Sequence, residues 1–323
     1  MLDQSAQKWL ANLLGASVRF GEPMSRHTSF RVGGPAAAYA VPRGENRLID
    51  LLTGLREREI PFLVVGDGTN LLVSDRGVAG VVVAMSDGDA GVRVETDNRD
   101  ENRGKDVRED EVRVAVPAAL RTTRLCAWAV DRGLTGTERL AGIPGTVGGA
   151  IRMNAGTALG TVGDLLQDLT LLGPDGRIDR VGRNQVRLSH RRCELPGADA
   201  GEPVILSATL ALRPASDGPA GRRRAVARLL AERKRRQPLR WPSAGCVFKN
   251  PPDAPGAGAL IDRAGLKGRR VGGAAVSYRH ANFIINRGGA TAADVRTLMA
   301  TVQETVADRF GVRLTPEVRS VGD

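Results

Sequence analysis

Apolar residues in the first third of the chain follow helical spacing in some stretches and form short continuous runs in others. Leucine and isoleucine recur at helical intervals over 45–58, and a further helix is predicted over 3–14. Short apolar runs bounded by glycine or proline predict strands at 36–41, 62–65 and 78–84. The pattern therefore predicts a strand–helix–strand unit with an added strand, in a first part that ends at residue 85.

The apolar pattern stops between Ser86 and Glu111. This stretch has ten acidic and five basic residues and few apolar ones. Such a composition buries too little surface to offset the entropy lost on ordering. It predicts a solvated insertion or a long hairpin tip over 86–111.

Regular patterning resumes after the insertion. Helices are predicted at 120–132 and 291–310, with Gly311 as the C-cap of the second. Strands are predicted at 112–116, 169–172, 204–212, 273–277 and 283–286. The whole pattern predicts an α+β protein in three parts, with bounds 1–85, 86–214 and 215–323.

The charge of the chain is +11, and much of the excess lies in one segment. Between Arg213 and Arg240 there are ten basic residues against Asp217 and Glu232. The segment fits an amphipathic helix with its charged face in water, a surface that attracts an anionic small molecule, or a nucleic-acid contact. Aromatic residues make up only 3% of the chain, which leaves few platforms for stacked bases, so we predict no nucleic-acid partner.

The sequence also indicates in which compartment of the cell the protein is found. No apolar run approaches the roughly 18 residues of a membrane span, and residues 1–20 lack the order of a signal peptide. We therefore predict a cytoplasmic protein without a membrane partner. We also expect a monomer or a weak homo-oligomer. The cysteines, Cys126, Cys193 and Cys246, have no CxxC spacing, which argues against a disulfide framework and a metal site. Cys126 lies on a predicted helix and is interpreted as a core residue.

Two glycine-rich loops suggest a bound cofactor. The first, GDGTNLLV from Gly66 to Val73, follows a predicted strand and would let backbone N–H groups approach a pyrophosphate; alone it could equally be a hairpin turn. The second, GIPGTVGGA from Gly142 to Ala150, has four glycines in nine residues, although a tight strand-to-helix connection would also explain it. Neither is a GxGxxG or Walker loop. The pair is harder to explain as ordinary turns.

A further stretch, PSAGCVFKNP from Pro242 to Pro251, places a thiol, an ammonium group and a carboxamide close together. With these motifs the sequence resembles the UDP-N-acetylenolpyruvoylglucosamine reductase family over nearly the whole chain, from about Thr28 to Arg319. The glycine loops look like the two flavin-binding loops of the vanillyl-alcohol-oxidase type of FAD domain. PSAGCVFKNP, HANFIIN and LTPEVR are more particular to the reductase.

The resemblance implies a fold and a reaction. Two N-terminal subdomains would bind FAD, and a C-terminal α/β domain would bind a nucleotide-sugar substrate. NADPH would reduce the FAD, and hydride would then pass to the double bond of UDP-N-acetylglucosamine enolpyruvate. The product would be UDP-N-acetylmuramate, a peptidoglycan precursor, which connects the reaction to cell-wall synthesis, cell shape and cell division.

The resemblance also assigns roles to individual residues. Arg191 would polarise the substrate carboxylate, a protonated Glu317 would assist, and Cys246 would protonate the carbanion. The residues expected to bind FAD are Arg31, Gly33, Gly66, Asp67, Gly68, Thr69, Asn70, Gly142, Ile143, Pro144, Gly145, Thr146, Gly148 and Gly149. The residues expected to contact the nucleotide sugar are Lys249, Asn250, His280 and Asn282. A purely structural His280 and a shift of the catalytic arginine to Arg192 are the alternatives.

The chain departs from the family pattern at three positions. Cys246 stands where serine is usual, His190 replaces a tyrosine before the arginine, and Cys193 replaces a serine after it. Tyr39 and Tyr278 are the only tyrosines, and neither lies in the tyrosine-bearing loop that some members carry. Two rival functions remain: another FAD-dependent oxidoreductase that acts on an alcohol or hydroxy acid, and a basic nucleic-acid-binding protein.

Overall fold

The structure, a computed structural model, describes residues 2–85, 91–95 and 111–322. By internal contacts it divides into two compact units. Unit 1 comprises Met1–Val41, Leu55–Ala84 and Glu232–Asp323, and unit 2 comprises Pro42–Gly54 and Met85–Ala231. Both units contain helices and strands, and the large sheet of unit 2 is antiparallel, which confirms the α+β class. The three-part division at residues 85 and 214 stays a prediction.

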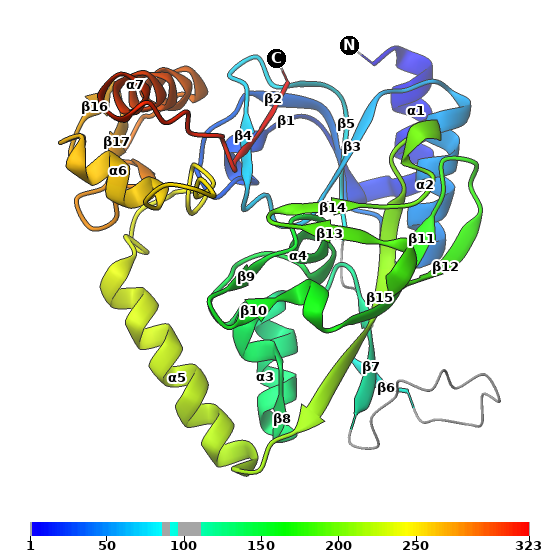
Figure 1. The fold of residues 1–323 in the computed structure, drawn as a ribbon. Helices are drawn as coiled ribbons and strands as arrows, with labels where there is room; N and C mark the ends of the chain where they lie inside the picture. The colour runs from blue at the N-terminus through cyan, green and yellow to red at the C-terminus, as the bar shows by residue number, and fades with distance from the viewer. Residues whose placement is uncertain (1, 86–90, 96–110, 323) are drawn as a thin grey trace. The chain divides into compact units, whose positions relative to one another are not determined.

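The N-terminal portion of unit 1 is built on a four-stranded sheet in the order β1-β2-β5-β3 (Figure 1). Its strands are β1 (Val18–Pro23), β2 (Pro35–Ala40), β3 (Phe62–Val65) and β5 (Val78–Ala84). Helix α1 (Gln4–Leu14) precedes the sheet. Helix α2 (Glu45–Glu57) connects β2 to β3 in the sequence, and its residues up to Gly54 belong to unit 2. Both β2 and β3 pair in parallel with β5, so the predicted strand–helix–strand unit is confirmed, with β5 between its two strands.

The C-terminal portion of unit 1 returns to the beginning of the chain. It contains α6 (Ala257–Arg263), β16 (Arg270–Val271), β17 (Ala274–Val276), β18 (Ile284–Asn286), α7 (Ala292–Phe310) and β19 (Arg319–Val321). β19 pairs in parallel with β4 (Leu71–Val73), the strand after the first glycine loop. Phe30 and Phe248 are buried in the same apolar cluster as residues of α6 and α7. One core therefore joins the N-terminal loop to the C-terminal segments that carry the predicted chemistry.

Helix α7 illustrates how local sequence sets the ends of an element. The Thr291 side chain accepts a hydrogen bond from the N–H of Asp294 at 3.0 Å, and Asp294 accepts one from the N–H of Thr291 at 3.0 Å. This reciprocal capping box satisfies two N–H groups that have no partner inside the helix. At the other end Gly311 has φ 68°, so the predicted C-cap is confirmed.

Unit 2 contains a largely antiparallel sheet in the order β12-β11-β15-β7-β6, with β8 also paired to β15. Its strands are β6 (Arg93–Val94), β7 (Val112–Pro117), β8 (Leu134–Thr135), β11 (Leu166–Leu172), β12 (Ile178–Gly182) and β15 (Val204–Pro214). Smaller elements are α3 (Thr122–Asp131), α4 (Val147–Arg152), β9 (Gly156–Thr157), β10 (Gly160–Thr161), β13 (Arg187–Ser189) and β14 (Arg192–Glu194). Within the predicted insertion, residues 86–90 and 96–110 lie outside the described residues.

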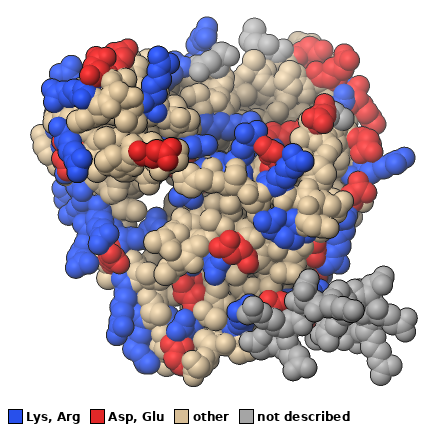
Figure 2. All heavy atoms as spheres, in the orientation of Figure 1, with Lys and Arg blue, Asp and Glu red and all other residues tan. Residues whose placement is uncertain are grey.

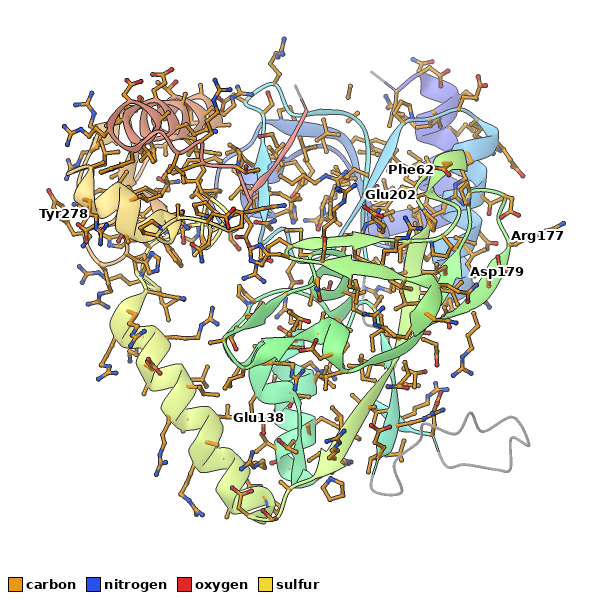
Figure 3. All side chains as sticks on the ribbon, in the orientation of Figure 1. Phe62, Glu138, Arg177, Asp179, Glu202 and Tyr278 are labelled. Carbon is orange, nitrogen blue, oxygen red and sulfur yellow. The ribbon has the colours of Figure 1, made fainter. Side chains whose placement is uncertain are left out.

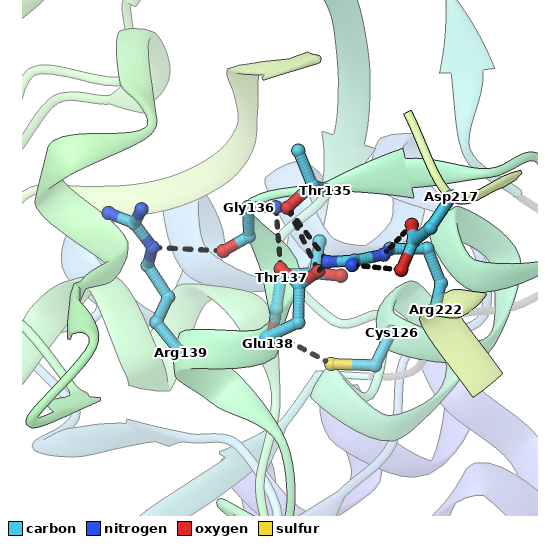
Figure 4. Close-up of polar contacts among 8 residues, drawn as sticks. All are labelled: Cys126, Thr135, Gly136, Thr137, Glu138, Arg139, Asp217 and Arg222. Carbon is cyan, nitrogen blue, oxygen red and sulfur yellow. Dashed lines mark hydrogen bonds and ion pairs between the residues drawn. The ribbon is translucent and has the colours of Figure 1, made fainter. Parts of the chain in front are cut away.

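Cys126 is a core residue of unit 2, as its place on a helix predicted. The thiol donates to the carbonyl oxygen of Thr137 at 3.3 Å (Figure 4). Burial raises the pKa of Cys126 to about 12, so the thiol remains protonated at neutral pH. This environment makes Cys126 unreactive and removes it from the list of possible catalytic thiols.

The basic segment forms α5 (Gly218–Arg236), which runs from unit 2 into unit 1. Figure 2 shows Lys and Arg side chains along most of this helix. Near its start, Arg222 donates to Asp217 and, at 2.8 Å, to Glu138 (Figure 4). The predicted helix is confirmed, but its buried apolar face is not. Within α5, all of which the structure describes, only Gly221 is buried, because the leucines alternate with too many arginines to form a continuous apolar stripe. None of the described helices is both long and apolar enough to span a bilayer.

Candidate functional site

The first glycine loop lies between β3 and β4 and packs against residues 27–31. Gly68 has φ +63°, and a Cβ at this position would overlap the carbonyl oxygen of His27. The N–H of Ser29 donates to the carbonyl oxygen of Gly68 at 3.2 Å. The same 27–31 segment ends at Arg31, which also has a positive φ of 55°. The two segments therefore meet through their backbones, an approach that only glycine permits at position 68.

Gly68→Ala is expected to destabilise the protein by about 3 kcal/mol and to weaken FAD binding, because strain at a positive φ adds to a backbone overlap. Gly21→Ala is the matched control: Gly21 has φ +62°, but nothing lies within 4 Å of its added Cβ. Strain alone should cost this variant about 1–2 kcal/mol. Urea unfolding and FAD titration measure both effects, and equal losses in the two variants would contradict the close packing at Gly68.

Asn70 connects the first glycine loop to the segment that carries Glu317. The side-chain amide of Asn70 donates to the carbonyl oxygen of Glu317 at 3.0 Å, and the N–H of Arg319 donates to the carbonyl oxygen of Asn70 at 3.0 Å. Asn70, predicted as a cofactor contact, thus also fixes the backbone at a predicted catalytic residue.

The structure brings Cys246 and Glu317 together by pairing their two segments. The N–H of Glu317 donates to the carbonyl oxygen of Val247 at 2.7 Å, and Phe248 forms an antiparallel bridge with Pro316. The N–H of Lys249 donates to Thr315 at 2.9 Å, which extends the pairing by one step. Cys246 and Glu317 are both half-buried. Residues 71 positions apart in the sequence therefore lie in adjoining backbone segments.

Asn282 holds the Cys246 segment from its other side. Its side-chain oxygen accepts from the N–H of Phe248 at 3.0 Å, and its amide donates to the carbonyl oxygen of Phe248 at 2.8 Å. The carbonyl oxygen of Asn282 accepts from the N–H of Val247 at 2.9 Å. Asn282 is 3% exposed. This geometry favours a role in supporting the segment, and the predicted contact of Asn282 with substrate stays a prediction.

Of the other residues predicted to bind substrate, Lys249 and Asn250 lie in the same segment as Cys246, and His280 lies next to Asn282. Lys249 is half-buried and Asn250 is exposed. The side-chain oxygen of Asn250 accepts from the N–H of Ala257 at 3.0 Å, which fixes its orientation at the start of α6. His280 is half-buried, and its Nδ1 accepts from the N–H of Asn282 at 3.3 Å. Asn250 and His280 are thus both held by hydrogen bonds to backbone.

Burial lowers the pKa of His280 below its ordinary value of 6.5, and the charge of Lys267 adds to this effect. His280 therefore contributes stability that is fully present above pH 6.5 and is lost as the pH falls through its folded-state pKa. His280→Gln should reduce the loss of unfolding free energy between pH 7.5 and pH 5. Urea unfolding at the two pH values measures this, and an identical pH dependence in wild type and variant would contradict a neutral, buried His280.

The second glycine loop belongs to unit 2 and leads into α4. The Thr122 side chain donates to the carbonyl oxygen of Ile143 at 2.6 Å, and the Thr122 N–H donates to Gly145 at 2.9 Å. Thr146 caps α4 by accepting from the N–H of Gly149 at 3.2 Å. Gly145 has φ +118°, and a Cβ at Gly148 would press on Ala118. Gly142 and Pro144 are also part of this loop. The backbone angle at Gly145 and the close packing at Gly148 explain why glycine stands at these two positions.

Arg191 occupies the turn between β13 and β14 in unit 2. Its φ is 56°, and its guanidinium donates to the carbonyl oxygen of Gly156 at 3.4 Å. Asn154 fixes the same hairpin, since its amide donates to the carbonyl oxygen of Ser189 at 3.0 Å. Arg192, in contrast, has a side chain that is 68% exposed and pairs with Glu194 at 2.8 Å. The geometry favours Arg191 as the functional arginine, because Arg192 is occupied by a surface ion pair.

Sequence reasoning missed the supporting role of two asparagines. Asn154 is 7% exposed and has φ +40°, and Asn286 donates through its side chain to the carbonyl oxygen of Phe30 at 3.0 Å. The position of Asn154 just after a short helix was the available signal, because asparagine is among the residues that tolerate a left-handed backbone. Asn286 closes the HANFIIN motif, but the motif did not reveal its partner, which lies 256 positions away.

The predicted site residues are divided between the two units. Cys246, Glu317 and the first glycine loop belong to unit 1 and are connected by the hydrogen bonds described above. Arg191 and the second glycine loop belong to unit 2. Each unit thus carries one glycine loop and at least one predicted catalytic residue.

Comparison with known proteins connects these features to a family. The sequence model of the FAD binding domain matches residues 36–182, and that of the C-terminal domain of UDP-N-acetylenolpyruvoylglucosamine reductase matches 237–321. The chain is 44% identical over 324 residues to the "UDP-N-acetylenolpyruvoylglucosamine reductase" of Desulfosudis oleivorans, with 99% of this chain and 100% of the relative covered. It is 40% identical to the protein of that name from Geobacter metallireducens, with both chains fully covered.

A solved structure is similar to the whole chain. The crystal structure of UDP-N-acetylenolpyruvylglucosamine reductase from Thermus caldophilus has a TM-score of 0.73 and 34% identity, with 93% of this chain and 97% of that chain covered. The similarity thus extends over most of both units.

Proposed function

Because this chain belongs to the UDP-N-acetylenolpyruvoylglucosamine reductase family of FAD-dependent oxidoreductases, we propose that it reduces UDP-N-acetylglucosamine enolpyruvate to UDP-N-acetylmuramate with NADPH. The reaction supplies a peptidoglycan precursor. The observation that carries the proposal is the pairing of the Cys246 and Glu317 segments beside the first glycine loop. The backbone of a residue that carries a thiol thus lies next to that of a residue that carries a carboxyl group.

The two glycine loops fit the dinucleotide part of FAD. At Gly68 and Gly148 a side chain would overlap His27 and Ala118, and Gly145 has a positive φ, so glycine fixes the course of both loops. Glycine-rich backbone of this kind can approach a pyrophosphate closely, and Thr69 and Asn70 add polar side chains to the first loop. Bound FAD would supply the redox chemistry of the proposed reaction, the transfer of a hydride from NADPH to the substrate double bond.

Cys246 is the proposed proton donor. Addition of hydride to one carbon of the enolpyruvyl double bond leaves negative charge on the other carbon, beside a carboxylate, until a proton arrives. A thiol gives up a proton more readily than the hydroxyl of the serine usual in the family. The hydrogen bonds of Val247 and Phe248 to Glu317 and Asn282 hold the backbone next to this thiol.

Arg191 and Glu317 are proposed to stabilise the charge that develops before protonation. The planar guanidinium of Arg191 matches the two oxygens of the substrate carboxylate. Glu317 must carry a proton to assist, because an ionised carboxylate would repel the developing anion. Lys249, Asn250, His280 and Asn282 are the proposed contacts for the nucleotide sugar.

Product analysis tests this proposal against the rival reaction on an alcohol or hydroxy acid. FAD-loaded protein with NADPH should add two hydrogen atoms to the enolpyruvyl nucleotide, as mass spectrometry would show. Formation of hydrogen peroxide with an alcohol or hydroxy acid, and no reduced nucleotide, would overturn it. We also propose that the enzyme works in the cytoplasm, as a monomer or weak homo-oligomer.

A further inference from the structure

The side chain of Arg139 connects two elements of unit 2, and none of the proposed catalytic or binding roles uses it. Arg139 lies in the short helix η3 (Thr137–Leu140), just before the second glycine loop. Its Nε donates to the carbonyl oxygen of Gly136 at 2.9 Å (Figure 4). Its Nη1 donates to the carbonyl oxygen of Thr161 at 3.3 Å and to the carboxylate of Asp164 at 2.9 Å. The side chain is only 20% exposed, so these are not the contacts of a free surface arginine.

Helix η3 is a fixed base for this side chain. The carboxylate of Glu138 accepts from the N–H of Gly136 at 2.6 Å, from the hydroxyl of Thr135 at 2.9 Å and from Arg222 of α5 at 2.8 Å (Figure 4). Burial raises the pKa of Glu138, but these hydrogen bonds lower it more, so the net pKa lies below its ordinary value. An ionised carboxylate with several donors therefore fixes η3, and Arg139 extends from it.

The second element of the connection is the short helix η4 (Val162–Asp164), which follows β10. The carboxylate of Asp164 accepts from the N–H of Thr161 at 2.8 Å and so holds the start of this helix. A Cβ at Gly163 would overlap the Leu188 side chain of β13. Helix η4 thus lies directly against the β13–β14 hairpin, which carries the proposed catalytic arginine.

Asn154 continues the connection from η4 to the turn of Arg191. Its side-chain oxygen accepts from the N–H of Gly163 at 3.2 Å, and its amide donates to the carbonyl oxygen of Ser189 at 3.0 Å. Asn154 is 7% exposed, so little water can compete for these two hydrogen bonds. The position of η4 therefore fixes the backbone two residues before Arg191.

The β9–β10 hairpin holds the side chain of Arg191 as well. The guanidinium of Arg191 donates to the carbonyl oxygen of Gly156 at 3.4 Å. Gly156 pairs with Thr161 in this hairpin, and the carbonyl oxygen of Thr161 is one of the acceptors of Arg139. The backbone of the Arg191 turn and the guanidinium itself thus both depend on a segment that Arg139 fixes to η3.

We propose that Arg139 is a positioning residue, which holds the guanidinium of Arg191 where it meets the substrate carboxylate. A two-point contact between guanidinium and carboxylate needs a defined plane and distance, and an error of about 1 Å at a reacting group can cost about 100-fold in rate. Arg191 needs such support, because a non-glycine residue at φ 56° has a strained backbone. This role of Arg139 rests on the proposed function, since that function makes Arg191 the catalytic arginine.

Arg139→Gln tests this role in FAD-loaded protein. It should lower kcat for the enolpyruvyl nucleotide about 10- to 100-fold, while NADPH reduces the flavin at the wild-type rate. A residue needed only for the fold would slow both half-reactions equally, and that result would overturn the proposal. Arg177→Gln is the matched control and should behave as wild type does, because this arginine of unit 2 is 82% exposed and contacts only a neighbouring carboxylate, that of Asp175 (Figure 3).

A double variant shows whether Arg139 acts through Arg191. In an Arg191→Gln background, Arg139→Gln should cost less than about twofold, because no guanidinium remains to be positioned. A further loss as large as that of the single variant would overturn the proposal. If Arg139→Gln does not fold, Asp164→Asn takes its place: it removes the paired charge, keeps an oxygen for the N–H of Thr161, and should slow the same half-reaction alone.

Hydrogen exchange of FAD-loaded protein gives a measurement that needs no substrate. The amides of the β13–β14 hairpin should exchange about tenfold faster in Arg139→Gln than in wild type, with those of β7 and β11 unchanged, because the hairpin loses its support locally. Exchange equal to that of wild type would overturn the positioning role. If the hairpin exchanges faster in the variant but wild-type protein does not reduce the enolpyruvyl nucleotide, the connection from Arg139 to Arg191 stands and the proposed function fails.

Discussion

Cys246→Ala is expected to lower turnover about 100- to 10,000-fold while NADPH reduces the bound flavin at nearly the wild-type rate. The reason is that a positioned general acid contributes a factor of this size to the step it serves, and that step follows hydride transfer to the substrate. Stopped-flow absorbance of the flavin measures the two half-reactions separately. The variant should keep its fold, because Cys246 is only half-buried and its neighbours Val247 and Phe248 hold the segment.

Cys246→Ser is the matched control for this prediction. It restores a proton-bearing side chain, the one usual in the family, and should recover much of the activity lost with alanine. Wild-type enzyme should be inactivated by iodoacetamide and the serine variant should resist, since burial protects Cys126 and raises the pKa of Cys193. Equal losses in both half-reactions of Cys246→Ala would instead indicate a structural cysteine.

Arg191→Gln is expected to lower kcat for the enolpyruvyl nucleotide about 100- to 1,000-fold, with reduction of the flavin by NADPH unaffected. Loss of one preorganised donor to a developing oxyanion has an effect of this order. Glutamine keeps a polar side chain of moderate length on the turn. The variant therefore measures the loss of the charge and of the two-point contact. Steady-state and half-reaction kinetics together give both quantities.

Arg192→Gln tests the neighbouring position with the same substitution. Its side chain is 68% exposed and pairs with Glu194, and an exposed pair of this kind contributes little to stability. Activity should remain within about twofold of wild type. A larger loss in Arg192→Gln than in Arg191→Gln would move the catalytic role to Arg192 and contradict the geometry of the β13–β14 turn.

Local patterns predicted much of the fold. The helices α1, α2 and α7 and the strands β3 and β5 were predicted within a residue or two, because each depends on its own spacing of apolar residues and on local caps such as Thr291 and Gly311. The parallel pairing of β4 with β19 depends on residues almost 250 positions apart, and no local pattern contains it. Such long-range pairing is what places Glu317 beside the first glycine loop.

In the candidate site, too, local sequence patterns did not predict the contacts between distant residues. Motifs singled out Cys246, Glu317 and the glycine loops, yet the sequence did not show that Asn70 and Asn282 hold those segments through their side chains. Asparagine offers both a donor and an acceptor, so its role depends on which backbone groups the fold brings to it. Helix α5 is the opposite case, since apolar residues within a basic segment suggested a buried face that the helix does not have.

Anaerobic reoxidation of the reduced flavin tests the central claim most directly. FAD-loaded protein is bleached with one equivalent of NADPH without oxygen, and UDP-N-acetylglucosamine enolpyruvate is then added. The flavin absorbance should return in a single turnover, with one equivalent of UDP-N-acetylmuramate formed. If the flavin is bleached by NADPH but stays reduced after the nucleotide is added, the proposed substrate is wrong.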